Sequence, residues 1–181
     1  MKLIDITRKL DGNVMIYEGD PKFIAVKIRD IDSDGYEISK LSMGSHTGTH
    51  LDAPCHFILD GKTAYEIPLS YCVGECVVVD ELEAVDGRIK KVLWSSKTGG
   101  GRLTMEEADM LIEKGIHLIG TEKLSIGGDE IHRKLLGNGC IILEALDLRK
   151  TEAKKYFLSA APLKMDTDGS PLRAFLIDEE A

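Results

Sequence analysis

One thirteen-residue segment, SHTGTHLDAPCHF at 45–57, constrains the fold of this chain more than any other part of the sequence. It contains three of the five histidines, His46, His50 and His56, together with Asp52. All four residues occupy even-numbered positions, so an extended strand would place their side chains on one face. A straight strand would, however, separate His46 from Asp52 by about 20 Å, at ~3.3 Å per residue.

A metal ion with ligands near ~2.1 Å cannot reach both ends of such a strand, so the chain must bend if these side chains act together. Gly48 and Pro54 stand where a bend can occur, because glycine tolerates unusual backbone angles and proline interrupts regular structure. The same two residues disfavour a regular helix. We therefore expect an irregular, folded-back loop at the end of a strand.

The chemistry of the segment points to a metal site. Imidazole and carboxylate ligands without thiolates are typical of zinc, manganese or iron in sites that keep a position open for water. A second stretch, IHRKLLGNGCIILEAL at 131–146, adds His132 on a short helix and Glu144 in an apolar strand. A buried carboxylate is costly unless it is paired or binds a metal. The alternatives are that the histidines cap turns, and that Glu144 faces solvent on an edge strand or pairs with a lysine.

Composition limits the class of protein. With 181 residues, the chain is expected to form one domain over 1–181. Its net charge of −8 disfavours binding to nucleic acid or to an anionic membrane surface. No apolar run approaches a membrane span, and the N-terminal residues do not resemble a signal peptide. We expect a cytoplasmic protein with reduced cysteines, namely Cys55, Cys72, Cys76 and Cys140.

Strand-like runs dominate the chain, with a few helices between them. The helix at 103–115 has the clearest signals, because Thr104 and Glu107 form a capping box and Gly115 follows its last turn. A second, shorter helix is expected at 130–136. Apolar runs predict strands at 75–82, 90–96, 116–120 and 140–146. The pattern predicts a mixed α/β fold.

Two turns are also expected between strands. Residues 30–38 are expected to form a turn between two strands, with Asp34-Gly35 supplying the turn chemistry. Residues 162–177 are expected to form two strands around a turn at Asp168-Gly169. Among single residues, Trp94 is expected in the core and His117 is expected to be structural. Arg173 could anchor a substrate carboxylate, but we favour an inter-strand ion pair.

The run HTGTHLDAPCHF, followed by IPLSYCVGECVVVD, resembles the cyclase-like metal-dependent hydrolases that include bacterial kynurenine formamidase and isatin hydrolase. The resemblance extends over nearly the whole chain, since YEGDP at 17–21, GTEKLSIGG at 120–128 and DGSPLRAFL at 168–176 follow in family order. It implies an α/β protein with the swivelling β/β/α fold, a mixed, strand-rich core and few helices. It also implies assembly into a homo-oligomer, either a dimer or a tetramer.

The resemblance implies roles for particular side chains. One or two divalent metal ions, zinc or manganese, would be held by five of them: His46, His50, Asp52, His132 and Glu144. His56 matches the catalytic histidine, and Tyr17 and Asp20 lie in the substrate-side segment, although Asp20 could simply form a turn before Pro21. The expected reaction is cleavage of an amide C–N bond by a metal-activated water, as in an arylformamidase.

The chain departs from the formamidase pattern in two places. Glu18 replaces the proline of an aromatic-Pro-Gly-Asp element, and Glu122-Lys123 replace Asp-Thr in the middle loop. Both changes are expected to alter the charge near the substrate pocket, so the sequence predicts hydrolase chemistry more firmly than formylkynurenine as the substrate. The alternatives are a cyclic-amide hydrolase of the isatin type, a lactonase or cyclase, and a non-catalytic protein with a structural metal.

Overall fold

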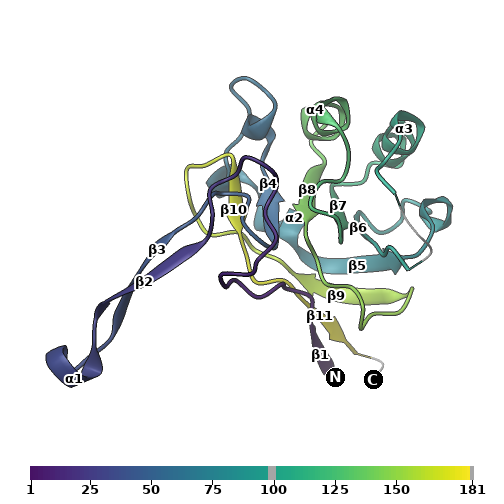
Figure 1. Ribbon diagram of the computed structural model, residues 1–181. Coiled ribbons are helices and arrows are strands. Elements are labelled where there is room, and N and C mark those ends of the chain that lie inside the picture. The colour runs from purple at the N-terminus through teal and green to yellow at the C-terminus, as the bar shows by residue number, and fades with distance from the viewer. Residues whose placement is uncertain (98–100, 180–181) are drawn as a thin grey trace.

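A curled β-sheet of nine strands forms the body of the structure, and a separate two-stranded sheet projects from it as an arm (Figure 1). The computed structural model describes residues 1–97 and 101–179. In spatial order the nine strands are β1 (Lys2–Asp5), β11 (Phe175–Asp178), β9 (Lys155–Ser159), β5 (Val73–Val79), β6 (Lys91–Trp94), β7 (Leu118–Thr121), β8 (Ile141–Glu144), β4 (His50–Asp52) and β10 (Gly169–Pro171).

The middle of this sheet is parallel and both of its ends are antiparallel. Strands β5, β6, β7 and β8 run parallel to one another. At one end β4 pairs antiparallel with β8, and β10 pairs antiparallel with β4. At the other end β9 pairs antiparallel with β5, and β11 connects β9 to β1. Because β8 lies between β7 and β4, the alternative that Glu144 faces solvent on an edge strand is wrong.

The two faces of the sheet are covered by two separate hydrophobic cores. Alternate residues along a strand point to opposite faces, so Leu118 packs in one core and its neighbour Ile119 in the other. Helices α3 (Met105–Glu113) and α4 (Asp129–Gly137) lie together on one side of the sheet (Figure 1). The second core includes residues of both helices, and Leu111 of α3 is fully buried in it. The strand-rich α/β architecture expected from the sequence is confirmed.

Helix α3 forms for the reason that the sequence indicates. The hydroxyl of Thr104 accepts a hydrogen bond from the backbone N–H of Glu107 at 3.2 Å, and the Glu107 carboxylate accepts one from the N–H of Thr104 at 2.7 Å. Gly115, with φ of 66°, follows the helix in the left-handed region that glycine favours. The capping box and the helix are therefore confirmed.

Shorter helical elements occupy the connections, and they include α2 (Leu69–Cys72) and 3₁₀ turns at Pro54–His56, Ala64–Glu66 and Leu82–Ala84. None of the helices in the described ranges has the length and apolar character needed to cross a membrane.

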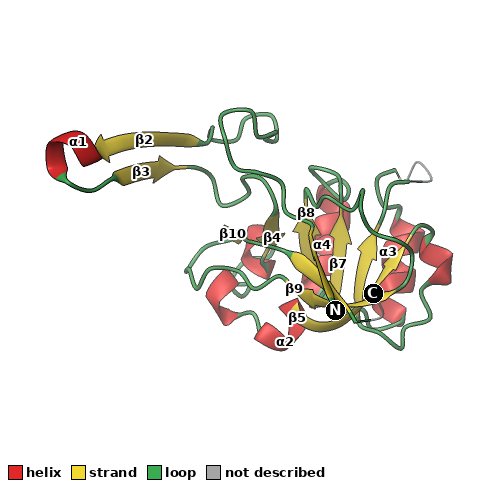
Figure 2. Ribbon diagram, turned by 90° about the horizontal axis from the view of Figure 1, so that it is seen from below, coloured by secondary structure: helices red, strands yellow, loops and turns green. Residues whose placement is uncertain are grey.

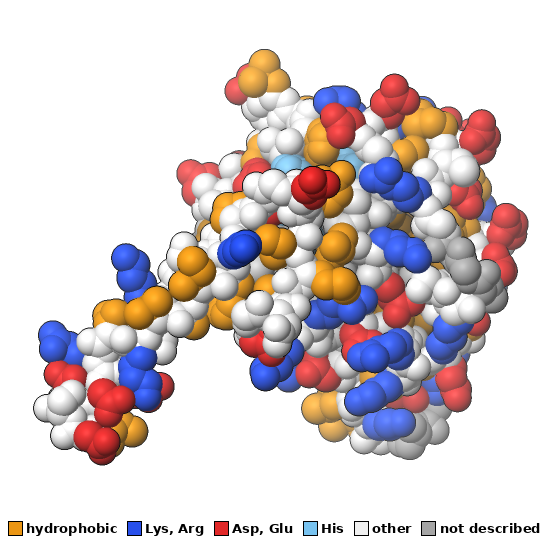
Figure 3. Space-filling model, in the orientation of Figure 1, with side chains coloured by type: hydrophobic (Ala, Val, Ile, Leu, Met, Phe, Trp, Pro, Cys, Tyr) orange, Lys and Arg blue, Asp and Glu red, His pale blue; other side chains and the backbone are white. Residues whose placement is uncertain are grey.

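The arm consists of β2 (Ile24–Arg29) and β3 (Ile38–Ser42), joined at its tip by one helical turn, α1 (Ile31–Asp34) (Figures 1 and 2). The expected turn between two strands is confirmed, with Gly35 in the left-handed conformation at φ of 78°. Every residue of β2 and β3 is exposed, and hydrophobic side chains lie along the arm (Figure 3). Its large apolar side chains are 44% to 63% exposed: Ile24, Val26, Ile28, Ile31, Tyr36, Ile38 and Leu41.

The predicted turn at Asp168-Gly169 is wrong. Gly169 begins strand β10 and pairs with Asp52 of β4, and residues 172–174, which form no turn, lead on into β11. Glycine is needed at position 169 because the backbone there passes close to the His46 ring and to the Leu51 carbonyl group, not because the chain turns. A Cβ atom at position 169 would lie 2.6 Å from Cε1 of His46 and 2.8 Å from the carbonyl oxygen of Leu51.

Candidate metal centre

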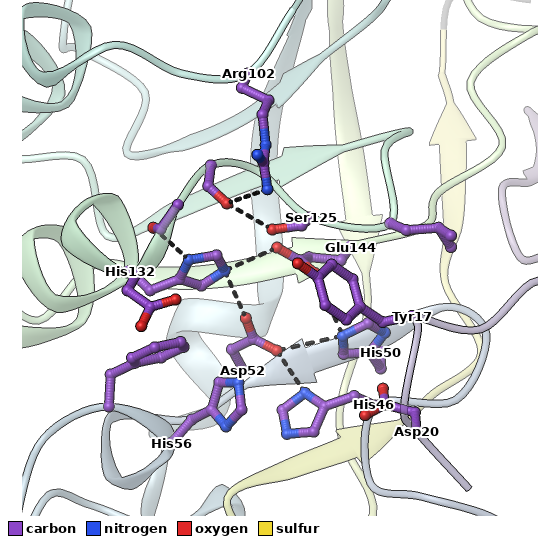
Figure 4. A pocket seen from close by; sticks show the side chains of 15 residues that line it. Tyr17, Asp20, His46, His50, Asp52, His56, Arg102, Ser125, His132 and Glu144 are labelled. Atoms are coloured by element: carbon purple, nitrogen blue, oxygen red, sulfur yellow. Dashed lines mark hydrogen bonds and ion pairs between the residues drawn. The ribbon is translucent and has the colours of Figure 1, made fainter.

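The structure brings together all eight side chains that the sequence analysis selected. They line one cavity of about 240 Å³ at the β4–β8 end of the sheet (Figure 4). Four lie on or beside β4, two come from α4 and β8, and two come from the segment before the arm: His46, His50, Asp52, His56, His132, Glu144, Tyr17 and Asp20.

Strand β4 is short because the chain bends on both sides of it. Gly48 has φ of 68°, and a Cβ atom there would lie 2.4 Å from Cδ2 of Leu10, so the bend requires glycine. Pro54 begins a 3₁₀ turn that ends at His56. The bends expected at Gly48 and Pro54 are confirmed, and they allow His46 and His56 to approach each other with ring centroids 4.0 Å apart.

His50 presents Nε2 to two buried carboxylates. Its Nδ1 donates a hydrogen bond to the carbonyl oxygen of Gly48 at 2.7 Å, which fixes the ring. Its Nε2 lies 3.3 Å from Oδ1 of Asp52 and 3.6 Å from Oε2 of Glu144. A histidine that binds a metal through one nitrogen usually donates the other N–H to such a backbone or carboxylate acceptor.

His132 repeats this arrangement from the other side of the cavity. Its Nδ1 donates to the carbonyl oxygen of Gly128 at 2.9 Å, one turn back along α4. Its Nε2 lies 3.2 Å from Oε1 of Glu144 and 3.7 Å from Oδ2 of Asp52. Two imidazole nitrogens from different elements therefore face the same pair of carboxylates.

The charges of this cluster require compensation. Burial would raise the pKa of Asp52, but hydrogen bonds from His46 and His50 hold it well below its usual range. Burial and the negative charge of Asp52 raise the pKa of Glu144. Burial would lower the pKa of His46, but its hydrogen bonds and charge interactions with Asp52 and Asp168 raise it to about 9. The carboxylates thus favour positive charge between them.

The donor set fits a divalent metal ion. Oδ2 of Asp52 is buried, and within the described part of the chain it makes no hydrogen bond, since His132 at 3.7 Å is too far away. Two groups of side chains each have ligand atoms within 4.8 Å of one another: His50, Asp52 and Glu144 form one, and His46, Asp52 and His56 form the other. Asp52 belongs to both groups, so it is the side chain that would help to hold a divalent metal ion at either position.

Comparison with known proteins identifies the family. Residues 4–92 match the family model described as "Putative cyclase". A kynurenine formamidase from Bacillus cereus is 33% identical, with 96% of each chain covered. The chain belongs to the cyclase family. It is therefore an enzyme, a hydrolase of this family.

Solved structures of cyclase-family hydrolases share the fold over nearly the full chain. One described as a potential metal-dependent hydrolase with cyclase activity has a TM-score of 0.79 and 28% identity, and 99% of each chain is covered. Isatin hydrolase A from Labrenzia aggregata has a TM-score of 0.82 and 26% identity, covering 98% of this chain and 94% of its own. The strand-rich fold implied by the resemblance is thus shared with a hydrolase of the isatin type.

Asp168 is a site residue that the sequence analysis missed. Its Oδ2 lies 3.0 Å from Nε2 of His46 and 3.1 Å from Nδ1 of His56. Its Oδ1 accepts a hydrogen bond from the hydroxyl of Ser45 at 2.8 Å. The sequence signal was an aspartate before a glycine in DGSP, which is also the signal of an ordinary turn.

The wall of the cavity combines apolar and polar groups. Phe57 stacks on His132 with ring centroids 4.8 Å apart. Arg102 donates a hydrogen bond from Nη2 to the carbonyl oxygen of Gly127 at 3.1 Å. Among the described residues that line the cavity, Arg102 is the only lysine or arginine. Tyr17 also lines a neighbouring hollow, so the two hollows adjoin.

Of the three residues that depart from the formamidase pattern, two line a hollow beside the cavity and one does not. Glu18 and Lys123 line the neighbouring hollow and can affect an extended substrate. Glu122 does not line either hollow, because its carboxylate accepts hydrogen bonds from Ser96 at 2.7 Å and from the backbone N–H of Leu148 at 3.1 Å. Lys123 is therefore the member of the Glu122-Lys123 pair that lies beside the pocket, and an effect of Glu122 on its charge stays a prediction.

Three residues that we expected to be structural lie outside the metal centre. Trp94 is buried, and its indole N–H donates to the carbonyl oxygen of Asp80 at 3.3 Å. His117 stacks on Tyr71 with ring centroids 4.6 Å apart. Arg173 forms an ion pair with Asp5 at 2.6 Å, where β1 meets the segment before β11. None of the three lines the cavity.

Proposed function

We propose that this cyclase-family enzyme is a metal-dependent amidohydrolase that cleaves the C–N bond of a formamide, as an arylformamidase does. The observation that carries the proposal is the position of His56, an imidazole held at the open cavity beside the buried metal-binding cluster. A structural zinc site is normally closed by four protein ligands, whereas a hydrolytic site keeps a position open for water and a base beside it. The 33% identical relative is named a kynurenine formamidase.

One or two zinc or manganese ions would be held by His46, His50, Asp52, His132 and Glu144. A bound ion of this kind supplies a Lewis acid that polarises a carbonyl group and lowers the pKa of water. The buried carboxylates of Asp52 and Glu144 supply the negative charge. Because Nδ1 of His50 and of His132 donates a hydrogen bond to a backbone carbonyl oxygen, Nε2 of each ring has the lone pair that can bind a metal ion.

His56 would move the protons of the reaction. Because its Nδ1 faces Asp168 at 3.1 Å, its Nε2 is the nitrogen that is available to the cavity. That atom can take a proton from the attacking water and deliver it to the leaving nitrogen. Tyr17 and Asp20, in the cavity wall, would contact the substrate.

Hydrolysis of a cyclic amide of the isatin type is the second candidate, favoured by the fold shared with isatin hydrolase A. A lactonase or cyclase reaction would use the same groups. A substrate panel on the metal-loaded enzyme separates these reactions: N-formyl aromatic amines, isatin-like lactams and small esters. We expect the N-formyl amines to be hydrolysed with the highest kcat/KM. Faster turnover of the lactams or esters would overturn the arylformamidase proposal.

We also propose that the chain self-associates through the arm. A two-stranded hairpin is at best marginally stable in water, yet the arm extends from the body with apolar side chains exposed along it (Figure 3). Soluble oligomers are most often symmetric assemblies of one chain, so we assign a second copy as the partner. Sedimentation should give a dimer or tetramer, and Val26→Asp in the arm should shift it toward the monomer. A monomeric wild-type protein would contradict this assignment.

The four cysteines are all free. On that ground we propose a reducing compartment, the cytoplasm, as the place where the enzyme acts.

A further inference from the structure

We infer that Asp168 is a positioning residue that orients two histidines at once, His46 at the metal centre and His56 at the open cavity. The inference rests on the proposed function and extends it to a residue outside the cluster of metal-binding side chains. One carboxylate oxygen, Oδ2, faces both rings, at 3.0 Å from His46 Nε2 and 3.1 Å from His56 Nδ1. The other oxygen accepts from Ser45 at 2.8 Å.

These contacts define which nitrogen of each ring carries a proton. An ionised carboxylate only accepts hydrogen bonds, so His56, which faces Asp168 through Nδ1, carries its proton on that nitrogen. A neutral imidazole has one N–H, and the opposite nitrogen then presents a lone pair, which for His56 is on Nε2. His46 faces a carboxylate with each nitrogen, Asp168 with Nε2 and Asp52 with Nδ1, and donates to both while it is protonated. In His46 the Nδ1 proton faces Oδ1 of Asp52 at 2.9 Å, so a metal ion held by these two side chains would replace that proton and leave the one on Nε2, which Asp168 accepts.

Both lone pairs therefore serve the proposed chemistry. The Nδ1 atom of His46 is directed at Asp52, and these two side chains would hold a metal ion together. The Nε2 atom of His56 remains free to accept a proton from water. A single change of tautomer at either ring would reverse its role, since a protonated nitrogen neither binds a metal nor acts as a base.

The backbone holds Asp168 in place independently of these contacts. Its carbonyl oxygen accepts a hydrogen bond from the N–H of Ala53 at 2.9 Å, and the next residue, Gly169, pairs with Asp52 in the β4–β10 ladder. The strand that carries His50 and Asp52 thus also positions the carboxylate that orients His46 and His56. Gly169 permits the approach, because a side chain there would collide with the His46 ring.

Asp168 differs from the buried acids of the cluster. Its side chain is 43% exposed, whereas the side chains of Asp52 and Glu144 are 1% and 5% exposed. It belongs to neither of the two groups of ligand atoms that lie close enough to share an ion, among the residues the structure describes. Its place beside the cluster is that of the outer carboxylate that commonly orients a metal-binding histidine.

The test compares Asp168→Asn with Asp166→Asn. Both variants lose one negative charge in the same segment, but Asp166 is exposed, and the hydrogen bonds from the two rings within the described residues go to Asp52 and Asp168. Loss of an outer carboxylate typically lowers metal affinity or activity ~10–100-fold. For Asp168→Asn we expect zinc affinity to fall about tenfold, and kcat at saturating zinc to fall by ~10–100-fold with little change in KM. Asp166→Asn should retain wild-type values.

A second measurement remains informative even if Asp168→Asn fails to fold. Long-range ¹H–¹⁵N correlations in the zinc-loaded wild-type protein report the tautomer of each histidine without any substrate. We expect the proton on Nδ1 of His56 and on Nε2 of His46. Finding it on Nε2 of His56, or finding wild-type kcat and zinc affinity in Asp168→Asn, would overturn the inference. Absence of amide hydrolysis by the wild-type enzyme would instead overturn the proposed function, because the tautomers and zinc affinity are measured without turnover.

Discussion

His50 on β4 lies directly opposite Glu144 on β8 in the antiparallel register. Residues that are directly opposite in such a pair project to the same face of the sheet, and here Nε2 of His50 and Oε2 of Glu144 are 3.6 Å apart. Both side chains are buried. Pairing between two strands far apart in the sequence therefore builds one half of the metal centre.

Replacing His50 with alanine should remove most of the bound metal. The substitution deletes an imidazole nitrogen that faces both Asp52 and Glu144, and the remaining carboxylates have no substitute donor at that position. Elemental analysis of the purified protein measures the effect, with His117→Ala as the matched control because His117 lies outside the cavity. Full metal content in His50→Ala would exclude it as a ligand.

Replacing Glu144 with glutamine should weaken metal binding without unfolding the metal-free protein. Glutamine keeps the shape and can still accept the hydrogen bond that Ile126 N–H donates at 2.8 Å, while it removes a charge that burial and Asp52 both disfavour. A tenfold loss of affinity would reduce metal-induced stabilisation by about 1.4 kcal/mol, equivalent to a Tm difference of about 3–6 °C. Thermal unfolding with and without zinc measures it, and an unchanged metal-induced Tm shift would contradict the assignment.

The sequence predicted those parts of the molecule whose signals are local. The spacing of His46, His50 and Asp52 by itself indicates a metal site. Gly48 and Pro54 mark the bends that bring the side chains on either side of β4 together. Helix α3 could be predicted because a capping box spans only three residues. In each case the interacting groups are close together in the chain.

What could not be predicted depends on strand pairing. Asp168 reaches His46 and His56 only because β10 lies beside β4, and no local pattern reports which strands become neighbours. Gly169 was misassigned for the same reason, since a glycine needed for a close approach and a glycine needed for a turn look alike in a sequence. The arm likewise has strand signals but no local sign that it leaves the body.

Replacing His56 with alanine should separate catalysis from metal binding. General acid–base assistance typically contributes about 10²–10⁴ in rate, so kcat should fall on that scale while metal content stays at the wild-type level. The comparison requires both measurements on the same preparation, because His56 also lies near enough to His46 and Asp52 to share an ion. Loss of metal together with activity would make His56 a ligand, and retention of both would remove it from the mechanism.

Replacing Gly169 with alanine should damage the metal centre through steric conflict. The new methyl group would lie 2.6 Å from Cε1 of His46 and 2.8 Å from the carbonyl oxygen of Leu51. Because the second contact is with backbone, moving the His46 side chain alone would not relieve the overlap. Overpacking of this kind typically costs about 1–3 kcal/mol. We expect a lower Tm and reduced metal content, whereas Gly12→Ala, which has open space around it, should change neither. Normal metal content in Gly169→Ala would show that His46 can move without loss of the site.

Alkylation should distinguish Cys55 from the other cysteines. Burial raises the pKa of Cys72, Cys76 and Cys140 to about 12, and the three side chains are almost completely inaccessible. Cys55 is only partly buried. Because the thiolate is the reactive form, iodoacetamide at pH 8 should modify Cys55 first in the native protein, and all four cysteines in guanidinium chloride. Peptide mass spectrometry measures each site, and rapid native labelling of Cys140 would contradict the packing.

The pairing of β4 with β10 also has a consequence for biosynthesis. A nascent chain that ends before residue 168 already contains every histidine of the site, but it lacks the strand beside β4 and the carboxylate that orients His46 and His56. The same chain lacks β11, to which β1 pairs. We therefore expect a truncated polypeptide, which lacks these contacts, to bind a divalent metal ion less tightly than the full chain. On this basis we expect the metal to bind only after the last strands have been synthesised.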